Sequence, residues 1–541
     1  MKPLFAFYRT RIAVVLCFTV VLAMLVSCQV DQSPNVDDTG TSSLVSTDMK
    51  DTETDMTETK DTETPEPDSG TTDDEDYYGN LVDQTMKSDY KLEYLRDGEW
   101  IEYDVLALKT TRTVHYRWDV FEGGFADLYT EEDSLRIRVS KSGVSDWTIR
   151  PAENVSDWKE IGRNKVEFTL KNQGVVSLEP NGHLYKNLLI RLSSPMDQED
   201  TGSVECSRVI RLGPGIHEYG NNARITKVDG NPTFRLKGGE HLILEEGAVL
   251  RAQILIETAV NVAITGGGII DLLEFNPENC LNDGKNPTYP FGIRFTNSKN
   301  LYIAGVTIRN SCLFTCSGAG SQNIEIRGIK TFTGAQNGDG INFHGCSNIT
   351  VSDCLLRNSD DCIAVYSSVA DARNISVSNC VLWSDSAHAI NIGTHGSSNP
   401  NNRHYIEDVT FSDIYVPECC CFSDEYWGVI GLTMGDENIC RNLTFENFKV
   451  DNITQSRLID IKIVKLDLWN PRPGYLIEGI HIKNIHYNGD NKNGSVIFGY
   501  DEERIVRDIL IEDLYINGEK MTSLEQAGIV TNNFTSDVKI K

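Results

Sequence analysis

The chain is short of basic residues. Its 541 residues include 50 Lys and Arg against 79 Asp and Glu, which gives a formal net charge of −29. Nucleic-acid binding depends on clustered Lys and Arg that neutralise phosphates, so this balance argues against a nucleic-acid partner. It also disfavours a polyanionic substrate unless basic residues gather at one site. Hydrophobic residues make up 40% of the chain, so most of it can bury a core.

Long hydrophobic runs are also scarce. The run at residues 12–26 follows three basic residues and is shorter than the usual membrane-spanning helix. It ends in Leu25-Val26-Ser27-Cys28, which resembles a bacterial lipobox. The resemblance implies a lipoprotein signal peptide over 1–28, acylation of Cys28 and a lipid anchor at the bacterial cell envelope or surface. An ordinary signal peptide with an incidental Cys is the alternative.

Residues 29–78 have a very different composition from the rest of the chain. Over 29–76 there are 16 acidic residues and two Lys, a net charge of −14, and almost no large apolar side chains. Such a segment cannot bury enough surface to offset its ordering entropy. We therefore expect a disordered, acidic, Thr- and Ser-rich tether that holds about half of the total negative charge.

Residues 85–200 are predicted to form a small β-sandwich. Apolar and polar residues alternate over 135–139, 166–170 and 188–192, as they do in half-buried strands. Clusters of Gly, Pro, Asn and Asp separate these runs at a spacing typical of sandwich domains.

From 205 to 541 the sequence is repetitive. A four-residue motif with apolar second and fourth positions recurs every 23 to 39 residues, which is the pattern of a strand with one buried face. Several copies lie about 25 residues apart, enough for three short strands and three turns. This predicts an all-β fold, a right-handed parallel β-helix whose stacked coils share one core. The motif begins at Asn261, Asn300, Asn323, Asn348, Asn374, Asp408, Asn442, Gly479 and Asp508.

The 14 cysteines do not indicate a metal site. None of their spacings matches a zinc motif, and three consecutive thiols at 419–421 cannot all face one ion in an extended chain. Cys354 and Cys380 occupy an apolar column, six residues after a motif start. We expect them to be buried thiols that behave as small hydrophobes, with a disulfide or a metal as the alternative. No cofactor is expected.

Ionisable residues precede three consecutive strands of a second column. These residues are Asp339, the pair Asp360-Asp361, and His388. Parallel coils stack about 4.8 Å apart, so these side chains should be neighbours on one outer edge. Carboxylates this close raise one another's pKa, which suits chemistry that needs a protonated acid and an ionised base. Ordinary turn formation by Asp, or a bound Ca²⁺, would be other uses of the cluster.

Four motifs in this order resemble glycoside hydrolase family 28, the polygalacturonases and their relatives. The resemblance covers about 240–520 and implies a pectin-lyase-like β-helix. The motifs are Gly266-Gly267-Gly268-Ile269-Ile270-Asp271, Asn337-Gly338-Asp339-Gly340, Asp360-Asp361-Cys362-Ile363-Ala364 and His388-Ala389-Ile390-Asn391-Ile392-Gly393.

The resemblance also implies residue roles in an inverting hydrolysis of a polysaccharide. Asp360 would protonate the leaving glycosidic oxygen, while Asp339 and Asp361 would hold and deprotonate the attacking water. His388 would hydrogen-bond within the cluster and help to keep the acid protonated. Asn337 is expected to bind substrate.

One strand departs from the family pattern. Polygalacturonases carry an Arg and a Lys on the strand after the His, where they bind the galacturonate carboxylate, but residues 428–433 read Gly-Val-Ile-Gly-Leu-Thr. Lys462, Arg403 or His404 are the candidate substitutes, and Lys462 is the expected substrate-binding residue. Loss of a bidentate Arg weakens carboxylate selection.

Three alternatives therefore stay open. The sandwich before the β-helix resembles family 49, the dextranases and isopullulanases, which share the three-Asp site and cut neutral glucans. A β-helix on a tether could also bind glycans without cutting them. A Ca²⁺-dependent lyase is the third alternative, although the shortage of basic residues in the cleft argues against it.

Overall fold

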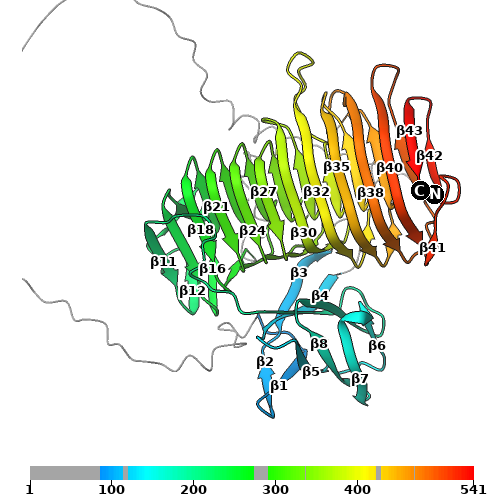
Figure 1. The fold of residues 1–541 in the computed structure, drawn as a ribbon. Helices are drawn as coiled ribbons and strands as arrows, with labels where there is room; N and C mark the ends of the chain where they lie inside the picture. The colour runs from blue at the N-terminus through cyan, green and yellow to red at the C-terminus, as the bar shows by residue number, and fades with distance from the viewer. Residues whose placement is uncertain (1–85, 114–119, 273–289, 336, 422–427, 468) are drawn as a thin grey trace, which may run out of the picture.

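The computed structural model describes residues 86–113, 120–272, 290–335, 337–421, 428–467 and 469–541 (Figure 1). The predicted signal peptide 1–28, the acylated Cys28 and the tether 29–78 lie outside these residues. Within the described part, the chain forms a small two-sheet body followed by a long coil of stacked strands. No helix in that part is long and apolar enough to cross a membrane.

The N-terminal body is a sandwich of two five-stranded sheets, in the orders β2-β1-β5-β8-β7 and β3-β4-β10-β9-β6. Its core lies between the sheets, where Phe168, Leu170, Val176 and Leu178 are fully buried. The predicted strands at 135–139, 166–170 and 188–192 correspond to β5, β8 and β10. The bounds are β1 Lys91–Arg96, β2 Glu99–Tyr103, β3 Leu106–Thr113, β4 Val120–Tyr129, β5 Ser134–Ser140, β6 Trp147–Arg150, β7 Val155–Gly162, β8 Lys165–Lys171, β9 Gly174–Pro180 and β10 Leu188–Ser193.

The C-terminal body is a right-handed parallel β-helix, as predicted. One long face is a sheet of 12 described strands, which we call the site sheet, because the acidic motifs precede its strands. Its strands are β13 Ile225–Val228, β14 Asn231–Leu236, β17 Gln253–Glu257, β20 Ile293–Thr296, β23 Cys316–Ala319, β26 Ile341–His344, β29 Ile363–Tyr366, β31 Ile390–Ile392, β34 Ile430–Met434, β37 Ile459–Ile463, β39 Ser495–Phe498 and β42 Ile529–Thr531.

The remaining strands of the β-helix form one continuous sheet of 21 described strands around the other faces. They are β11 Arg208–Leu212, β12 Gly215–Glu218, β15 Glu240–Leu244, β16 Ala248–Arg251, β18 Val260–Thr265, β19 Ile269–Asp271, β21 Lys299–Ala304, β22 Thr307–Arg309, β24 Gln322–Arg327, β25 Lys330–Phe332, β27 Ser347–Ser352, β28 Leu355–Asn358, β30 Ala372–Ser384, β32 Tyr405–Val416, β33 Cys419–Cys420, β35 Ile439–Val450, β36 Ile453–Gln455, β38 Leu476–Tyr487, β40 Ile505–Ile516, β41 Glu519–Lys520 and β43 Thr535–Ile540.

The first residue of each repeat motif makes a ladder along the β-helix. These residues adopt left-handed backbone conformations, as Asn323 and Asn348 do with φ of 56°. Asn tolerates this conformation better than other residues with a side chain, which explains its recurrence at the motif start. Each side-chain amide also donates to the amide oxygen one coil earlier. The distances are 2.8 Å from Asn300 to Asn261, 2.9 Å from Asn323 to Asn300, 3.0 Å from Asn348 to Asn323 and 3.0 Å from Asn374 to Asn348.

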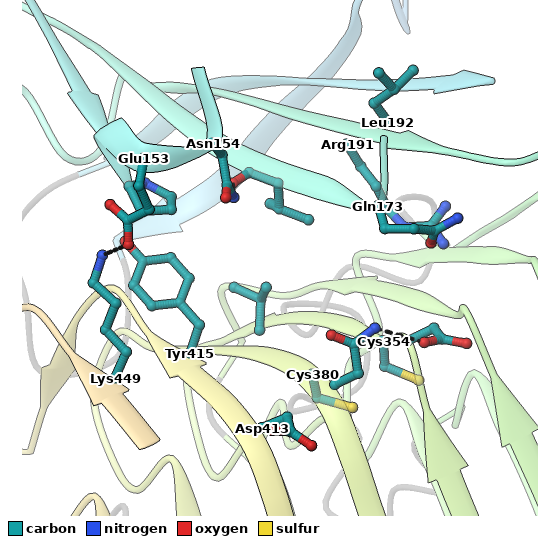
Figure 2. Close-up of a pocket in the computed structure, with 15 residues that line it drawn as sticks. Glu153, Asn154, Gln173, Arg191, Leu192, Cys354, Cys380, Asp413, Tyr415 and Lys449 are labelled. Carbon is teal, nitrogen blue, oxygen red and sulfur yellow. Dashed lines mark hydrogen bonds and ion pairs between the residues drawn. The ribbon is translucent and has the colours of Figure 1, made fainter. Parts of the chain in front are cut away.

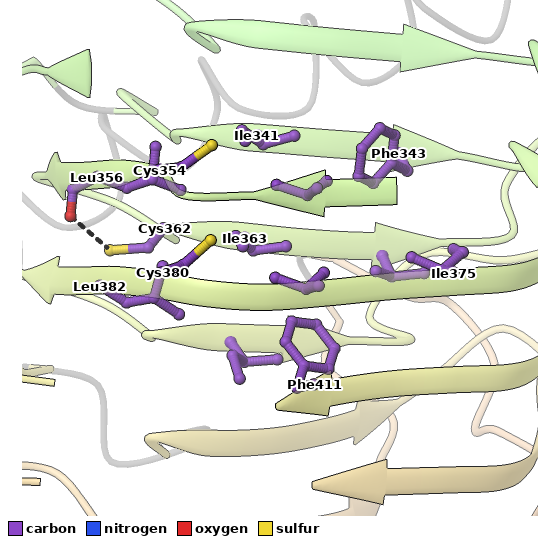
Figure 3. Close-up of a cluster of buried hydrophobic side chains, with 14 of the residues drawn as sticks. Ile341, Phe343, Cys354, Leu356, Cys362, Ile363, Ile375, Cys380, Leu382 and Phe411 are labelled. Atoms are coloured by element: carbon purple, nitrogen blue, oxygen red, sulfur yellow. Dashed lines mark hydrogen bonds between the residues drawn. The ribbon is translucent and has the colours of Figure 1, made fainter. Parts of the chain in front are cut away.

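The core of the β-helix consists of stacked columns of identical or similar side chains (Figure 3). Ile341 and Ile363 are paired neighbours in the site sheet, and Phe343 lies beside them. Cys354 and Cys380 are buried free thiols in an adjacent column, as the sequence predicted. Contact with Cys354, together with burial, raises the pKa of Cys380 well above that of an ordinary thiol.

A buried arginine joins the sandwich to the β-helix. Arg357 donates to Asp385 at 3.0 Å on the next coil and to Asn187 of the sandwich at 2.7 Å. Its guanidinium lies 4.2 Å from the ring centroid of Trp383, which is fully buried. Trp383 therefore packs at this interface. A buried charge that lost these partners would be strongly destabilising, so the two bodies are fixed to each other here.

Substitution within the Asn ladder should destabilise the β-helix. Asn348→Ala forces an alanine into the left-handed region and removes two ladder hydrogen bonds, so the free energy of unfolding should fall by about 2 kcal/mol. Urea denaturation followed by circular dichroism measures this loss. Asn348→Gly is the matched control, since glycine adopts the same backbone conformation and loses only the side chain. Equal stability of the Ala variant and the parent would contradict the ladder's role.

Candidate active site

The strand register brings the predicted acidic residues together. Ile341 pairs with Ile363, and Ile363 pairs with Ile390, in the site sheet. Asp339, Asp361 and His388 each lie two residues before one of these strands, so they form one column across three coils. Backbone hydrogen bonds confirm the alignment: the amide of Gly340 donates to the Asp361 carbonyl at 2.8 Å, and the amide of Cys362 to the His388 carbonyl at 2.9 Å.

A glycine allows the coils to approach at this point. A Cβ atom added to Gly340 would lie 2.4 Å from the carbonyl oxygen of Cys362 and 2.8 Å from the side-chain oxygen of Asn358. No real Cβ tolerates such contacts, so any larger residue would push this turn outward. Gly340 therefore keeps Asp339 within reach of the next coil.

Three carboxylates meet at the outer edge of these coils. One oxygen from each of Asp339, Asp360 and Asp361 lies within 4.8 Å of the other two. Asp339 and Asp361 are 4% exposed, and Asp360 is partly buried. Carboxylates this close and this dry cannot all be ionised together, so at least one must hold a proton near neutral pH.

Asp361 has the surroundings of an ionised carboxylate. One of its oxygens contacts Nδ1 of His388 at 2.6 Å and accepts from the His388 amide at 3.2 Å. The other accepts from Asn391 at 2.7 Å and from the Tyr366 hydroxyl at 3.1 Å. Burial acts to raise the pKa of Asp361, but the His388 charge and these donors outweigh burial and lower the pKa below its usual value.

Asp360 has the surroundings of a proton donor. Its two oxygens accept only weak backbone hydrogen bonds, from Asn337 at 3.2 Å and from Asp361 at 3.1 Å, among the described residues. Burial and the neighbouring Asp361 charge raise the pKa of Asp360 to about 7. His388 contacts Asp361, and its charge lowers the pKa of Asp360 directly while it stabilises the ionised Asp361, whose own charge raises the pKa of Asp360. The role expected for His388 in keeping the acid protonated stays a prediction.

Asp339 is the third member of the cluster, and its surroundings also favour the protonated form. Burial, with the charges of Asp360 and Asp361, raises the pKa of Asp339 well above its ordinary value. Its Oδ2 accepts from Asn342 at 2.7 Å, while its Oδ1 is buried and has no hydrogen-bond partner in the described part of the chain. A buried oxygen without a partner in a native structure usually serves a water or a ligand.

The candidate substrate-binding residues lie at different distances from the three carboxylates. Asn337 reaches the cluster through its backbone, as described above. Lys462 is on the outer face of β37, three coils beyond Asp361, where it pairs with Asp460 at 3.0 Å. Arg403 pairs with the buried Glu437 at 3.0 Å, and Nδ1 of His404 is hydrogen-bonded to a backbone carbonyl. Substrate binding by Asn337 and Lys462 stays a prediction.

Three polar residues of the site were missed by the sequence reasoning. Asn342, Tyr366 and Asn391 all point outward from site-sheet strands and contact the carboxylates. A signal was present, since each is a polar side chain at an alternating position of a buried strand, next to an acidic motif.

A separate cavity of about 240 Å³ lies between the sandwich and the β-helix (Figure 2). Glu153 and Gln173 of the sandwich face Tyr415, Cys380 and Lys449 of the β-helix across it. Lys449 forms an ion pair with Glu153, and both Cys354 and Cys380 line the wall. None of the three clustered carboxylates borders this cavity, so it is distinct from the candidate active site.

Comparison with known proteins defines the family. Residues 221–533 match glycosyl hydrolases family 28, and this match covers more than half of the chain. The chain therefore belongs to that family. All three carboxylates and His388 lie inside the matched region.

The curated relatives are polygalacturonases by name. The chain is 30% identical over 208 residues to the probable endopolygalacturonase D of Neosartorya fischeri, with 38% of each chain covered. It is 24% identical over 216 residues to the polygalacturonase QRT2 of Arabidopsis thaliana, covering 39% of this chain and 46% of the relative. The alignments span less than half of the length of either relative.

A solved structure with the same architecture is Dex49A from Penicillium minioluteum. The two chains superpose with a TM-score of 0.55 at 14% identity, covering 86% of this chain and 95% of the other. At this identity the likeness establishes a shared fold and nothing about the substrate.

The electrostatics of the cluster can be tested without any substrate. Asp361→Asn removes the neighbouring negative charge, so the pKa of Asp360 should fall from about 7 toward the usual range of an aspartate. Carboxyl ¹³C NMR across a pH series would follow this titration. An unchanged Asp360 titration would show that burial alone sets its pKa.

Proposed function

We propose that this protein is an inverting glycoside hydrolase that acts on a polysaccharide in the manner of a polygalacturonase. The observation that carries the proposal is the clustering of three carboxylates in unequal surroundings, with His388, Asn391 and Tyr366 all around Asp361. Burial and the Asp361 charge raise the pKa of Asp360 to about 7, while the His388 charge and these donors lower the pKa of Asp361. Hydrolysis of a glycosidic bond needs this combination of an acid for the leaving oxygen and a base for water.

In this mechanism Asp360 protonates the glycosidic oxygen as the bond breaks. Asp361 takes a proton from the attacking water, and its contacts with His388 and Asn391 hold it in the ionised form. Asp339 is protonated and acts as a hydrogen-bonding group that holds the water with its unpaired oxygen. In this proposal Asp361 is the base that deprotonates the water, and Asp339 only holds the water in position.

The spacing of the carboxylates makes the stereochemistry of hydrolysis a direct test of the proposed mechanism. Two-carboxylate inverting enzymes usually have their groups about 6.5–9.5 Å apart, and retaining enzymes about 5 Å apart. The separations of at most 4.8 Å in this cluster are closer to the retaining value. Inversion therefore requires that two carboxylates act together on one water, as Asp339 and Asp361 do in this proposal.

Polygalacturonate is the proposed substrate class, on the strength of the family and the relatives' names. A dextranase-like action on a neutral glucan is the second candidate, because the strand at 428–433 carries no basic residue. The shared fold with Dex49A includes the sandwich, but the fold does not select between them. We also propose that a lipid anchor at Cys28 holds the enzyme at the cell envelope, so that the substrate is extracellular.

Loss of the proposed acid should abolish catalysis and preserve the fold. Asp360→Asn should lower the rate of reducing-end release by about 10²- to 10⁴-fold, since the amide has no proton to transfer. The assay uses polygalacturonate, rhamnogalacturonan and dextran as a panel. Asp353→Asn is the matched control, because Asp353 is on a neighbouring turn and accepts from Asn379 at 2.8 Å, outside the cluster.

The control variant should retain parental activity, and both variants should unfold at the parental urea concentration. Product anomers observed by NMR in the first minutes of reaction report the stereochemistry, and inversion is the expected result. Full activity of Asp360→Asn would refute the assignment of the acid. Retention would make one of the other two carboxylates a nucleophile.

The pH profile of kcat/KM should follow the pKa values of Asp360 and Asp361. Asp360 must be protonated, so kcat/KM should decline as the pH rises through about 7. The His388 charge lowers the pKa of both Asp360 and Asp361. His388→Gln should therefore move both limbs of the profile to higher pH. Movement of the alkaline limb to lower pH would contradict this assignment.

A further inference from the structure

The outer face of the site sheet continues past the carboxylates toward the N-terminus. Strand alternation points Ile341 and Phe343 into the core, so Asn342 and His344 point outward. The register runs from Asn342 to Ser317 on the preceding coil and from Ser317 to Arg294 on the coil before it. Arg294 and Asn342 are thus two coil spacings apart, about 10 Å, with only a small side chain between them.

Two buried polar atoms on this face have no partner among the described residues. They are Oδ1 of Asn342, a residue with no exposed surface, and Nε2 of His344, a residue that is 7% exposed. Leaving a buried polar group unpaired is costly, and such atoms in a native structure usually serve a ligand or water. Asp339 Oδ1, next to them, is unpaired as well.

The chemistry of these atoms is fixed by their neighbours. Asn342 donates its amide to Asp339 at 2.7 Å, so its remaining oxygen can only accept a hydrogen bond. Nδ1 of His344 contacts the Ser368 hydroxyl at 3.1 Å, and burial lowers the pKa of His344 to about 3, so the ring is neutral. Together the two atoms offer hydrogen bonds to uncharged hydroxyl groups.

Arg294 adds a positive charge to the same face. Its side chain is partly exposed, and its guanidinium lies 4.9 Å from the ring centroid of Phe291. His344 lies two residues after Asn342 on β26, so it is on the same outer face as Arg294. Ser317 and Ala319, the outward residues of the strand between them, leave both groups uncovered from that strand.

We propose that Arg294, Asn342 and His344 form a sugar-binding subsite on the N-terminal side of the carboxylates, and that Arg294 makes it selective for a uronic acid unit. Asn342 and His344 bind the ring hydroxyls, and the guanidinium binds the carboxylate. This inference rests on the proposed function, since it places a sugar unit next to the reacting bond. It also supplies the anion recognition that the strand at 428–433 lacks.

Binding to an inactive protein tests the subsite separately from catalysis. In the Asp360→Asn background, calorimetry would measure the Kd of trigalacturonate, of its methyl ester and of isomaltotriose. Arg294→Gln should weaken trigalacturonate binding about tenfold, because a charge-assisted hydrogen bond is lost, and should leave binding of the methyl ester unchanged. Arg294→Lys should restore part of the affinity.

Two further variants separate charge from hydroxyl recognition. Arg235→Gln is the matched control, since Arg235 lies in the same outward column two coils before Arg294 and pairs with Glu257. It should bind all three trisaccharides like the parent. His344→Gln should weaken binding of trigalacturonate and of its methyl ester alike. In the active enzyme, Arg294→Gln should raise KM for trigalacturonate and change kcat by less than about twofold.

The outcomes distinguish the two proposals. Equal trigalacturonate binding by Arg294→Gln and its parent, or no binding of trigalacturonate at all, would overturn the subsite. Tighter binding of isomaltotriose than of trigalacturonate would also overturn it. Arg294-dependent binding without any hydrolysis by the parent enzyme would support the subsite and refute the proposed function.

Discussion

In-register stacking of coils is the constraint on which the site depends. Each coil lies about 4.8 Å from the next, and the Asn ladder links the motif starts of five successive coils, from Asn261 to Asn374. Once the register is set, residues two positions before β26, β29 and β31 must share a column. Backbone pairing therefore places Asp339 beside Asp361 and His388, whatever the interactions between the side chains. The carboxylates, left to themselves, would repel one another.

The free-energy cost of burying three neighbouring carboxylates explains the other contacts of the site. A buried carboxylate is tolerated when it is protonated or fully hydrogen-bonded. Asp361 is hydrogen-bonded, with His388, Asn391 and Tyr366 around it. The surroundings of Asp339 and Asp360 favour protonation, since their pKa values are raised. The unequal pKa values of the three carboxylates thus follow from how four neighbouring side-chain donors are distributed among them.

The sequence was sufficient for the features that depend on periodicity. The motif that starts at Asn261 and recurs to Asp508 specified the β-helix, and the same spacing predicted that Asp339 would lie near Asp361 and His388. It was insufficient for contacts between distant segments. Arg357 reaches Asn187 across 170 residues, and no local pattern marks Trp383 as part of that interface. The sequence also could not show which carboxylate His388 contacts, and its electrostatic effect on Asp360 depends on that contact.

The distribution of positive charge along the outer face bears on which side of the carboxylates can recognise an anion. On the C-terminal side, Arg457 and Lys462 both pair with Asp460, at 3.1 and 3.0 Å. A substrate carboxylate would have to compete there with a buried protein carboxylate for the same donors.

On the N-terminal side, Arg294 lies two coils before Asn342 on the same outer face, and its guanidinium is 4.9 Å from the ring centroid of Phe291. A guanidinium has five N–H donors, so it can bind a substrate carboxylate while it keeps its other contacts. An arginine at this position would therefore let an acidic chain recognise an anion before the carboxylates, whereas the strand at 428–433 after them carries no basic residue.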